Sequence, residues 1–446
     1  MKIPIVIDLM IFEQLSQFRQ SVYEQLGKAK DAVFELMDAA LTSISTVSFV
    51  GLCQSPVFRR QWSSVYAALH DSRLPQARLM QELARRVDTA EQPILAGDRT
   101  FWPRHDAATL QDRIFDHDSR QKSAVGQSYS TLAWIPEESG SWALPLRHER
   151  ISSFETPGQR AAFQLQHVTR HLERRPLAVY DRGYGNAKFV HQTAVIEADL
   201  LLRLAANRCV FGVPPAYGGR GAPRKHGVKF KFKDPTSWPE ATETIAVDDP
   251  HYGRVQLMRW SHFHFKQSPN RDMDIIRVEV IEPVGRKRKF QVLWLAWLGQ
   301  TWPGLQGLWR IYLRRFALEH WYRLAKQRLH WTQPQLSSNP ALERWSLLVV
   351  LMTWQLWLAR NECIDTPFPW QSPQDKLAPG RIVQGFASIL VAIGTPAKAP
   401  KPRGKSPGRA TGHCPSPRSH YPTVKKRARN RKQAKKVPKS TTVPAA

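Results

Sequence analysis

The sequence predicts an α/β protein whose mixed sheet is built in two parts around a β-rich insertion. Three observations support this fold class. Short apolar runs alternate with helical patterns over residues 91–211, the helical pattern is lost over residues 212–289, and it returns over residues 290–395. We expect a helical N-terminal domain over residues 1–90 and a disordered basic tail over residues 396–446.

The N-terminal region carries apolar side chains at helical spacing. Segments 12–20, 22–41 and 75–87 show this pattern and contain few Gly or Pro. Arginines recur between Arg59 and Arg86. The region is therefore predicted to be a helical, basic domain.

The first part of the core is predicted as three strands, a helix, a strand, a helix and a strand. In chain order these segments are 93–98, 128–135, 141–147, 157–174, 176–181, 188–196 and 199–204. Thr156 is a suitable N-cap, and Pro157 suits the first position of the first helix. Two of the strands end in acidic residues, Asp98 and Asp181. This succession is that of an RNase H-like core, in which side chains at strand ends can converge.

The insertion and the second part of the core follow. Segments 229–233, 255–260 and 275–280 have the composition of strands, and the residues between them suit loops. The core resumes with a strand at 290–298 and continues with helices at 312–329 and 339–360. The most apolar stretch lies in the last helix and falls short of the ~20 residues that a membrane span requires. We therefore expect a buried helix there and no membrane association.

The charge of the chain favours a polyanionic partner. The formal net charge is +28, and fifteen Lys and Arg between Lys398 and Lys439, with no Asp or Glu, supply about half of it. The remainder of the chain is basic as well, so nucleic acid is the leading inference and an acidic membrane surface the second. The four cysteines form no C-x-x-C pair. They argue against a zinc site and a disulfide framework, and they suit a reducing cytosol.

The helix at 312–329 carries a carboxylate between two cations. At about 100° per residue, Tyr312, Arg315, Glu319 and Lys326 fall within an arc of about 60°, roughly opposite an apolar face. A solvated charged face is the ordinary explanation of such a pattern. The spacing Tyr-(2)-Arg-(3)-Glu-(6)-Lys is more specific. It resembles the signature helix of insertion-sequence transposases that carry a YREK motif within the DDE, RNase H-like superfamily.

This resemblance covers about residues 93–360 and implies roles for the signature residues. Glu319 would be the third catalytic carboxylate of the family, and Tyr312, Arg315 and Lys326 would bind the phosphates of the transposon ends. The family also carries a β-strand insertion between its second Asp and its Glu, which agrees with the predicted insertion.

Asp181 and Asp98 are the candidates for the other two carboxylates. Asp181-Arg-Gly-Tyr184 is similar to the family's second motif, although Asp181 alone would also suit the cap of a turn. The first motif is commonly Asp-Gly-Thr, whereas this chain has Asp98-Arg-Thr100. In this chain the long side chain of Arg99 replaces the family's glycine. This leaves open whether Asp98 is the first carboxylate or, if it is, whether this copy is active. The alternatives to Asp98 are Asp106, Asp112 and Asp116, none of which ends an apolar strand.

Three carboxylates suit the chemistry of phosphodiester cleavage. The reaction needs an activated nucleophile, a stabilised leaving oxygen and neutralisation of the phosphate, and two Mg²⁺ ions about 4 Å apart meet these needs. Mg²⁺ prefers oxygen ligands. We expect Asp98, Asp181 and Glu319 to bind two Mg²⁺ ions, for which Mn²⁺ can substitute. Arg315 would grip phosphate as a fork and Lys326 as a point charge.

The sequence thus predicts a DNA transposase of an insertion sequence. It would bind terminal inverted repeats of double-stranded DNA, hydrolyse the phosphodiester at each end and join the freed 3′-hydroxyls to target DNA. The resemblance implies a homodimer in the synaptic complex and a bacterial, cytoplasmic enzyme at the nucleoid. The region 1–90 would either read the ends from the major groove or serve as a packing domain.

Three alternatives remain open at this point. The chain could be an inactivated relative that binds DNA without cutting it, or a structure-selective nuclease on the same core. It could also be a generic basic RNA-binding protein, in which case the three carboxylates need not converge.

Overall fold

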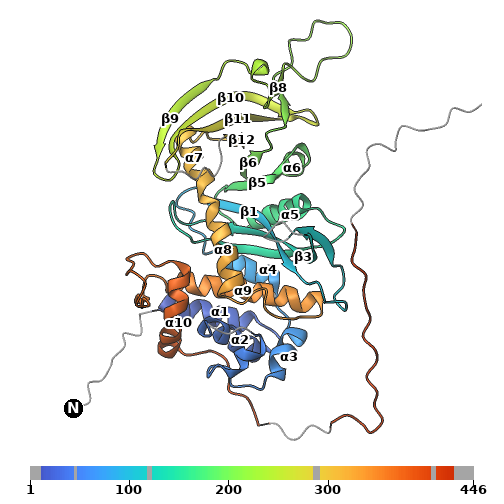
Figure 1. Cartoon of the computed structure of the whole chain (residues 1–446), viewed down its shortest axis with the longest axis vertical. Helices are drawn as coiled ribbons and strands as arrows, with labels where there is room; N and C mark the ends of the chain where they lie inside the picture. The colour runs from blue at the N-terminus through green and yellow to red at the C-terminus, as the bar shows by residue number, and fades with distance from the viewer. Residues whose placement is uncertain (1–11, 45–47, 118–122, 285–291, 403–407, 426–446) are drawn as a thin grey trace, which may run out of the picture.

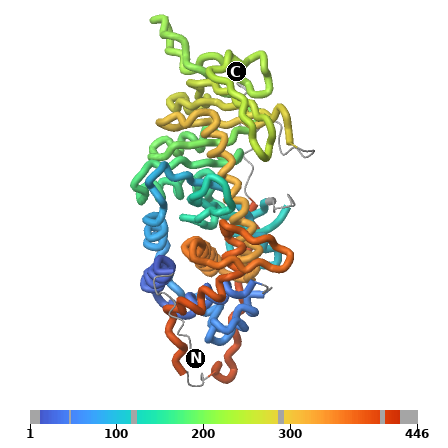
Figure 2. Tube along the Cα trace, turned by 90° about the vertical axis from the view of Figure 1, so that its left-hand side faces the viewer, coloured from blue at the N-terminus to red at the C-terminus, as the bar shows by residue number. Residues whose placement is uncertain are grey.

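The structure is a computed structural model that describes residues 12–44, 48–117, 123–284, 292–402 and 408–425. These residues form an elongated body, with the β-rich insertion at one end, a helical region at the other and the core between them (Figure 1). The view turned by 90° shows the same succession (Figure 2).

Helices and strands alternate along the described chain largely as the sequence predicts. The α-helices are α1 (Glu13–Gln25), α2 (Lys30–Thr42), α3 (Ser63–Asp71), α4 (Gln76–Ala84), α5 (Pro157–Thr169), α6 (Ala187–Gln192), α7 (Leu305–Arg314), α8 (Phe316–Gln327), α9 (Asn339–Ala359) and α10 (Pro379–Ile393). The strands are β1 (Ile94–Pro103), β2 (Ile114–His117), β3 (Ser123–Trp134), β4 (Leu144–Ile151), β5 (Leu177–Gly185), β6 (Asp199–Leu204), β7 (Cys209–Phe211), β8 (Lys229–Lys231), β9 (Glu243–Asp249), β10 (Gly253–Phe265), β11 (Ser268–Glu282) and β12 (Val292–Leu298). Two short 3-10 helices complete the set, η1 (Val50–Gln54) and η2 (Pro235–Ser237).

The core sheet has the strand order β4-β3-β1-β5-β6. Strand β3 is antiparallel to β1 and to β4, whereas β1, β5 and β6 are mutually parallel. Helix α5 connects β4 to β5, and α6 connects β5 to β6. Three antiparallel strands followed by two parallel ones, with helical crossovers, is the RNase H-like arrangement, so the predicted fold class is confirmed.

The insertion is continuous with the core sheet. Strand β12 pairs with β6 on one side and with β11 on the other, and β11 forms a long antiparallel hairpin with β10. Strands β7 and β9 also pair with β10, and β8 pairs with β7. The strands of the described residues therefore form one 12-stranded sheet.

The N-terminal helices pack on the C-terminal ones. Helix α1 contacts α9, and α2 contacts both α9 and α10. Arg19 of α1 forms a buried ion pair with Asp38 of α2 and also donates hydrogen bonds to Gln355 of α9 and to the carbonyl of Gly394. One hydrophobic cluster extends from Phe12 to Ala397. The N-terminal region thus shares its core with the rest of the chain.

Helix α9 is buried over most of its length, as predicted for the apolar stretch. Its residues pack against β4 of the core sheet and against α1 and α10. Among the residues that the structure describes, no helix has the length and apolar character that crossing a membrane requires.

Two predicted helices are interrupted in the structure. The predicted helix 22–41 is divided between α1 and α2, because Ala29 adopts a left-handed conformation with φ 64°. The predicted helix 312–329 is divided at Arg315 into α7 and α8. At this point Arg315 N–H and Leu318 N–H each bond to the carbonyl three residues earlier, at 3.3 and 3.0 Å. Arg315 itself keeps right-handed helical dihedrals, φ −53° and ψ −30°, so the interruption is confined to a single turn.

Part of the C-terminal tail lies along the edge of the core sheet. Val424 pairs with Ile114 of β2 in parallel, and the N–H of Val424 donates to the carbonyl of Arg113 at 2.7 Å. The Val424 side chain packs on a small apolar cluster of Phe101, Ile114 and Ala124. Residues 403–407 and 426–446 of the predicted disordered tail lie outside the described residues.

The contact of Val424 predicts that one substitution will release this segment. Val424→Asp is expected to accelerate proteolysis at Arg409 and Arg418 about tenfold, because burying a carboxylate in an apolar contact costs more than about 1.4 kcal/mol. Limited trypsin digestion followed by mass spectrometry measures the effect. His420→Asp is the matched control, since His420 is exposed. Equal digestion rates for the two variants would show that the contact of Val424 contributes no stability.

Candidate active site

Two predicted carboxylates follow the point where the parallel pairing of β1 and β5 ends, although β1 itself continues to Pro103 and does not end at Asp98 as predicted. Strands β1 and β5 are paired up to Gly97 and Tyr180, so the next residues in register are Asp98 and Asp181. The ring of Tyr180 lies directly on Gly97, where an added Cβ would come within 1.9 Å of a ring carbon. Glycine is needed at this position because any side chain would collide with the ring. The two strands are therefore neighbours, which is the condition for Asp98 and Asp181 to converge.

Strand β5 leaves its partner β6 immediately after Tyr180. The next pair in the ladder is Gly185 with Leu204, so the residues between them form a bulge. Asp181 is the first residue of this bulge, and its carboxylate lies 3.5 Å from Nη1 of Arg203 on β6. Bulges of this kind redirect side chains next to active sites. Here the bulge places Asp181, whose side chain is 36% exposed, where the regular pairing of β5 with β6 is interrupted.

The third carboxylate comes from helix α8, which packs on β1. Glu319 accepts a hydrogen bond of 2.9 Å from Nη2 of Arg315. Nη1 of the same guanidinium lies 3.6 Å from Oδ2 of Asp98. The side chain of Arg315 is 4% exposed, whereas those of Asp98 and Glu319 are 18% and 52% exposed. The buried guanidinium of Arg315 thus contacts both Glu319 of the helix and Asp98 of the strand.

The carboxylates are close enough to affect one another electrostatically. Burial raises the pKa of Asp98 to about 6; Arg315 opposes this shift, and the negative charges of Asp181 and Glu319 add to it. Burial alone would lower the pKa of Arg315, but Tyr312 and the three carboxylates outweigh burial and raise it. The pattern is that of a crowded anionic site with one internal cation.

Two further side chains of α8 join the helix to strand β1. The hydroxyl of Tyr322 lies 3.1 Å from the carbonyl of Asp98 and 2.9 Å from Oγ1 of Thr131. Nζ of Lys326 donates to Oγ1 of Thr100 at 2.7 Å, and burial lowers the pKa of Lys326. The threonine of the Asp98-Arg-Thr100 motif therefore positions the lysine of the signature helix.

The side chain of Arg99 does not enter the site. It forms an ion pair with Asp116, whose carboxylate also accepts a hydrogen bond from Ser128. Successive residues of a strand point to opposite faces, so Asp98 and Arg99 diverge. Arg99 departs from the family's Asp-Gly-Thr motif, but its side chain does not occupy the space around the Asp98 carboxylate.

Tyr312 and Arg315, predicted to lie opposite the apolar face of the helix, are themselves buried. Tyr312 is 1% exposed and Arg315 is 3% exposed. Tyr312 belongs to α7, which packs against β10, and its ring stacks on Trp309 at a centroid distance of 6.0 Å. Burial raises the pKa of Tyr312, while the guanidinium groups of Arg315 and Arg203 act in the opposite direction. The insertion explains this burial, because its strand β10 packs on α7.

The donor set of the site suits a hard divalent cation. Three carboxylates supply only oxygen atoms, the ligands that Mg²⁺ and Mn²⁺ prefer. Within the described part of the chain, no three His, Cys, Asp or Glu side chains are grouped closely enough to hold a metal ion. In this arrangement the Arg315 guanidinium supplies the positive charge between Asp98 and Glu319.

Sequence analysis missed Arg203, Tyr322 and Thr131. Arg203 lies on β6 opposite Asp181, and the strand itself was predicted, so its inward-facing residues were available as candidates. Tyr322 follows Glu319 by one helical turn, which was a usable signal. Thr131 carried no local signal, because only strand pairing brings it beside Asp98.

The raised pKa of Asp98 predicts a gain of stability on neutralisation. Asp98→Asn is expected to stabilise the metal-free fold by about 1–3 kcal/mol at pH 7, because the ionised carboxyl is disfavoured in the folded state. The folded pKa of about 6 exceeds the ordinary value of 3.8, so the difference should grow between pH 4 and pH 6 and be absent below pH 4. Thermal melts in a chelator, with the exposed Asp106→Asn as control, measure it. Identical curves for both variants would contradict the pKa shift.

Comparison with known proteins supports a nuclease assignment of the core. A family model described as DDE superfamily endonuclease matches residues 21–263, which include Asp98 and Asp181 and end before Glu319. Among solved structures, a similar one is the cryo-EM structure of the piggyBac transposase synaptic complex with hairpin DNA. It shares 7% sequence identity, covers 86% of this chain and 81% of that chain, and gives a TM-score of 0.44. No curated protein matches the chain.

Proposed function

Because the chain belongs to the DDE superfamily endonuclease family, we propose that it is a DNA transposase of an insertion sequence. It would bind the terminal inverted repeats of its element, hydrolyse the phosphodiester at each end and join the freed 3′-hydroxyls to target DNA. The observation that carries the proposal is the contact of Arg315 with both Asp98 and Glu319, beside the strand that carries Asp181, so that the charges of Asp181 and Glu319 add to the raised pKa of Asp98.

Asp98, Asp181 and Glu319 are the residues that would hold two Mg²⁺ ions, with Mn²⁺ as a substitute. Bound there, the ions would lower the pKa of the attacking water and neutralise charge on the phosphate. The different exposures of the three carboxylates suit this role. The side chains of Glu319 and Asp181 are partly exposed to solvent. The carboxylate of Asp98 accepts a hydrogen bond of 2.7 Å from the backbone N–H of Arg99.

The cations of the site would bind and orient the DNA phosphates. Arg203 and Lys326 flank the carboxylates on β6 and α8, and Arg315 lies between two of them. A fork-shaped guanidinium can bind two phosphate oxygens at once, and Lys326 can add a point charge. We assign Tyr312 a supporting role beneath Arg315, because its burial separates it from the surface.

Double-stranded DNA is the proposed partner. The net charge of +28 favours long-range attraction to the phosphate backbone, with an affinity that falls as salt rises. Both ends of an element must be cut in a coordinated way, so we propose that two copies of the chain assemble on the paired ends.

A DNA-binding relative that does not cut is the second candidate. The observation in its favour is the position of Arg315, whose guanidinium contacts Asp98 and Glu319 together. If that arrangement persists on DNA, the basic surface would bind without cleavage. A cleavage assay separates the two candidates.

The test is a cleavage and joining reaction with the full chain. Purified protein is incubated with linear DNA carrying the element's ends and a supercoiled target plasmid, in Mg²⁺, Mn²⁺ or a chelator. The transposase proposal expects nicks at the ends and joined products with either metal and none with the chelator. Nicks without joined products would indicate a nuclease, and a gel shift without nicks would indicate the non-cutting relative.

A further inference from the structure

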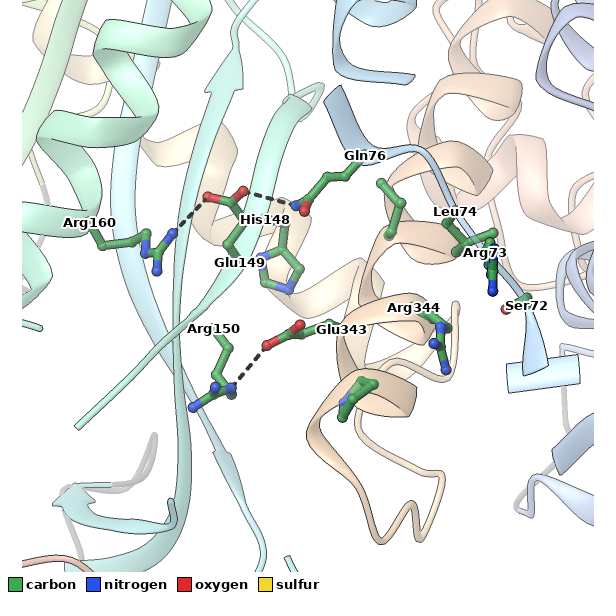
Figure 3. Close-up of a pocket in the computed structure, with 12 residues that line it drawn as sticks. Ser72, Arg73, Leu74, Gln76, His148, Glu149, Arg150, Arg160, Glu343 and Arg344 are labelled. Atoms are coloured by element: carbon green, nitrogen blue, oxygen red, sulfur yellow. Dashed lines mark hydrogen bonds and ion pairs between the residues drawn. The ribbon is translucent and has the colours of Figure 1, made fainter. Parts of the chain in front are cut away.

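A polar pocket lies away from the three carboxylates of the candidate active site, where the α3–α4 linker, strand β4 and the first turns of α9 meet. Its volume is about 450 Å³. Arg150 and Arg160 approach it from the core side, and Arg73 and Arg344 approach it from the helical side (Figure 3). His148 lines the pocket between these groups (Figure 3).

Two buried polar atoms on the wall of the pocket have no hydrogen-bond partner. Oγ of Ser72 and Nε2 of His148 are both buried, in residues that are 0% and 5% exposed. A buried polar atom without a partner costs about 1–3 kcal/mol, so such atoms are rare in folded proteins. Both atoms belong to residues that line the same cavity, so a polar occupant could supply their missing partners.

The acidic groups around the pocket are already paired. Glu149 accepts hydrogen bonds from Arg147, Gln76 and Gln164 and lies 3.7 Å from Arg160. Glu343 pairs with Arg150, as the dashed line in Figure 3 shows. The acidic groups therefore offset the charges of Arg150 and Arg160, although Nε of Arg160 has no partner, and the remaining charge of the pocket is positive.

Arg73 and Arg344 supply that remaining charge. The guanidinium of Arg73 forms no hydrogen bond or ion pair with any of the described residues. In Arg344 only Nη1 is engaged, donating to the carbonyls of Leu69 and His70 at 2.6 and 2.8 Å. Two guanidinium groups thus line the space with open donor capacity, and the buried Oγ of Ser72 and Nε2 of His148 belong to residues of its wall.

We propose that this pocket binds a phosphate group. The donors come from several directions and exceed the two oxygens that a carboxylate offers, whereas a phosphate presents at least two charged oxygens and further acceptors in a tetrahedral array. Arginine forks match phosphate oxygens in pairs. The phosphate belongs either to a DNA strand or to a free phosphate compound, and both present the same chemistry to these donors.

A short chain of hydrogen bonds joins this pocket to the candidate active site. Nδ1 of His148 lies 2.8 Å from Oγ1 of Thr131, which in turn contacts the hydroxyl of Tyr322. Tyr322 also contacts the carbonyl of Asp98. Burial and the charge of Lys326 lower the pKa of His148 to about 3, so its ring is neutral. If Thr131 donates to Nδ1, the proton of His148 is on Nε2, which has no hydrogen-bond partner among the described residues.

Calorimetric titration of the metal-free full chain with inorganic phosphate, at constant ionic strength, tests the proposal. We expect saturable binding at one site. Arg73→Ala should weaken it about ten- to hundredfold and Ser72→Ala about tenfold, as expected when a charge-assisted or neutral hydrogen bond is lost. Arg78→Ala, which removes an exposed arginine of α4, is the matched control and should bind as the unaltered chain does.

Two oligonucleotide arms identify the source of the phosphate. The same short strand is titrated with and without a 5′-phosphate, and each affinity is compared between Arg73→Ala and Arg78→Ala. A loss confined to the phosphorylated strand indicates a terminal phosphate, an equal loss for both indicates a phosphodiester, and a loss for inorganic phosphate alone indicates a small phosphate compound.

Two results would overturn the proposal. The first is the absence of saturable binding of inorganic phosphate to the unaltered chain. The second is equal phosphate affinity in Arg73→Ala, Ser72→Ala and Arg78→Ala, with unchanged melting curves showing that all three variants are folded. Neither result depends on whether the chain cuts DNA.

Discussion

Glu319→Gln is expected to reduce DNA cleavage by about 10³-fold or more while leaving DNA binding unchanged. The substitution keeps the size of the side chain and removes one negative charge from the proposed metal-binding set. The amide oxygen can still accept the hydrogen bond from Arg315, so the fold should be retained. Loss of a group that acts in the transition state commonly has an effect of this size. Single-turnover cleavage and gel shift on the same DNA measure the two quantities.

Glu197→Gln is the control for this experiment. Glu197 is exposed and precedes β6 of the same core, so its substitution removes an equal charge outside the site. It should cleave at the unaltered rate. If Glu319→Gln cleaves as well as Glu197→Gln, Glu319 has no catalytic role and the assignment of the signature helix fails.

Arg19→Leu is expected to lower the free energy of unfolding by about 3–5 kcal/mol, since it leaves the buried carboxylate of Asp38 without a counter-charge. The pair is bidentate, at 2.8 and 3.1 Å, and the side chains are 2% and 1% exposed. Arg19 also bonds to α9 and to Gly394, so its loss affects the whole helical end of the molecule. Chemical denaturation followed by circular dichroism provides the measurement.

The double variant Arg19→Leu, Asp38→Leu separates loss of charge pairing from loss of packing. Removing both charges should restore most of the stability that the single substitution removes, because no unpaired buried charge remains. Lys28→Leu should change stability by less than about 1 kcal/mol, since the ion pair of Lys28 with Asp71 is exposed. A single and a double variant of equal stability would mean that Asp38 is not buried in its charged form.

The fold class and the succession of core elements along the chain were predictable because both depend on local patterns. The segment predicted at 199–204 is strand β6 without a shift, and the helix that begins after Thr156 has the expected N-cap, as part of a capping box with Gln159. Apolar runs ending in Asp98 and Asp181 identified the two central strands. These features follow from burial of short runs and from cap chemistry, which act within a few residues.

The tertiary details of the site could not be read from the same patterns. Tyr312 is buried because α7 packs against β10 of the insertion, a contact between segments distant in the chain. Strand β2 was missed, since its pairing with β3 and with Val424 involves residues distant in the chain. Arg203 and Thr131 likewise acquire their positions from strand pairing.

The pairing of β12 with both β6 and β11 has a mechanical consequence for the whole molecule. An appended domain joined by a loose tether can swing freely, but a lobe joined through a shared strand can move only by twisting the sheet. A load applied at the β10–β11 hairpin would be transmitted through β12 to β6, where Arg203 faces Asp181. Movement of the insertion is therefore coupled through β12 to strand β6, which carries Arg203 beside Asp181.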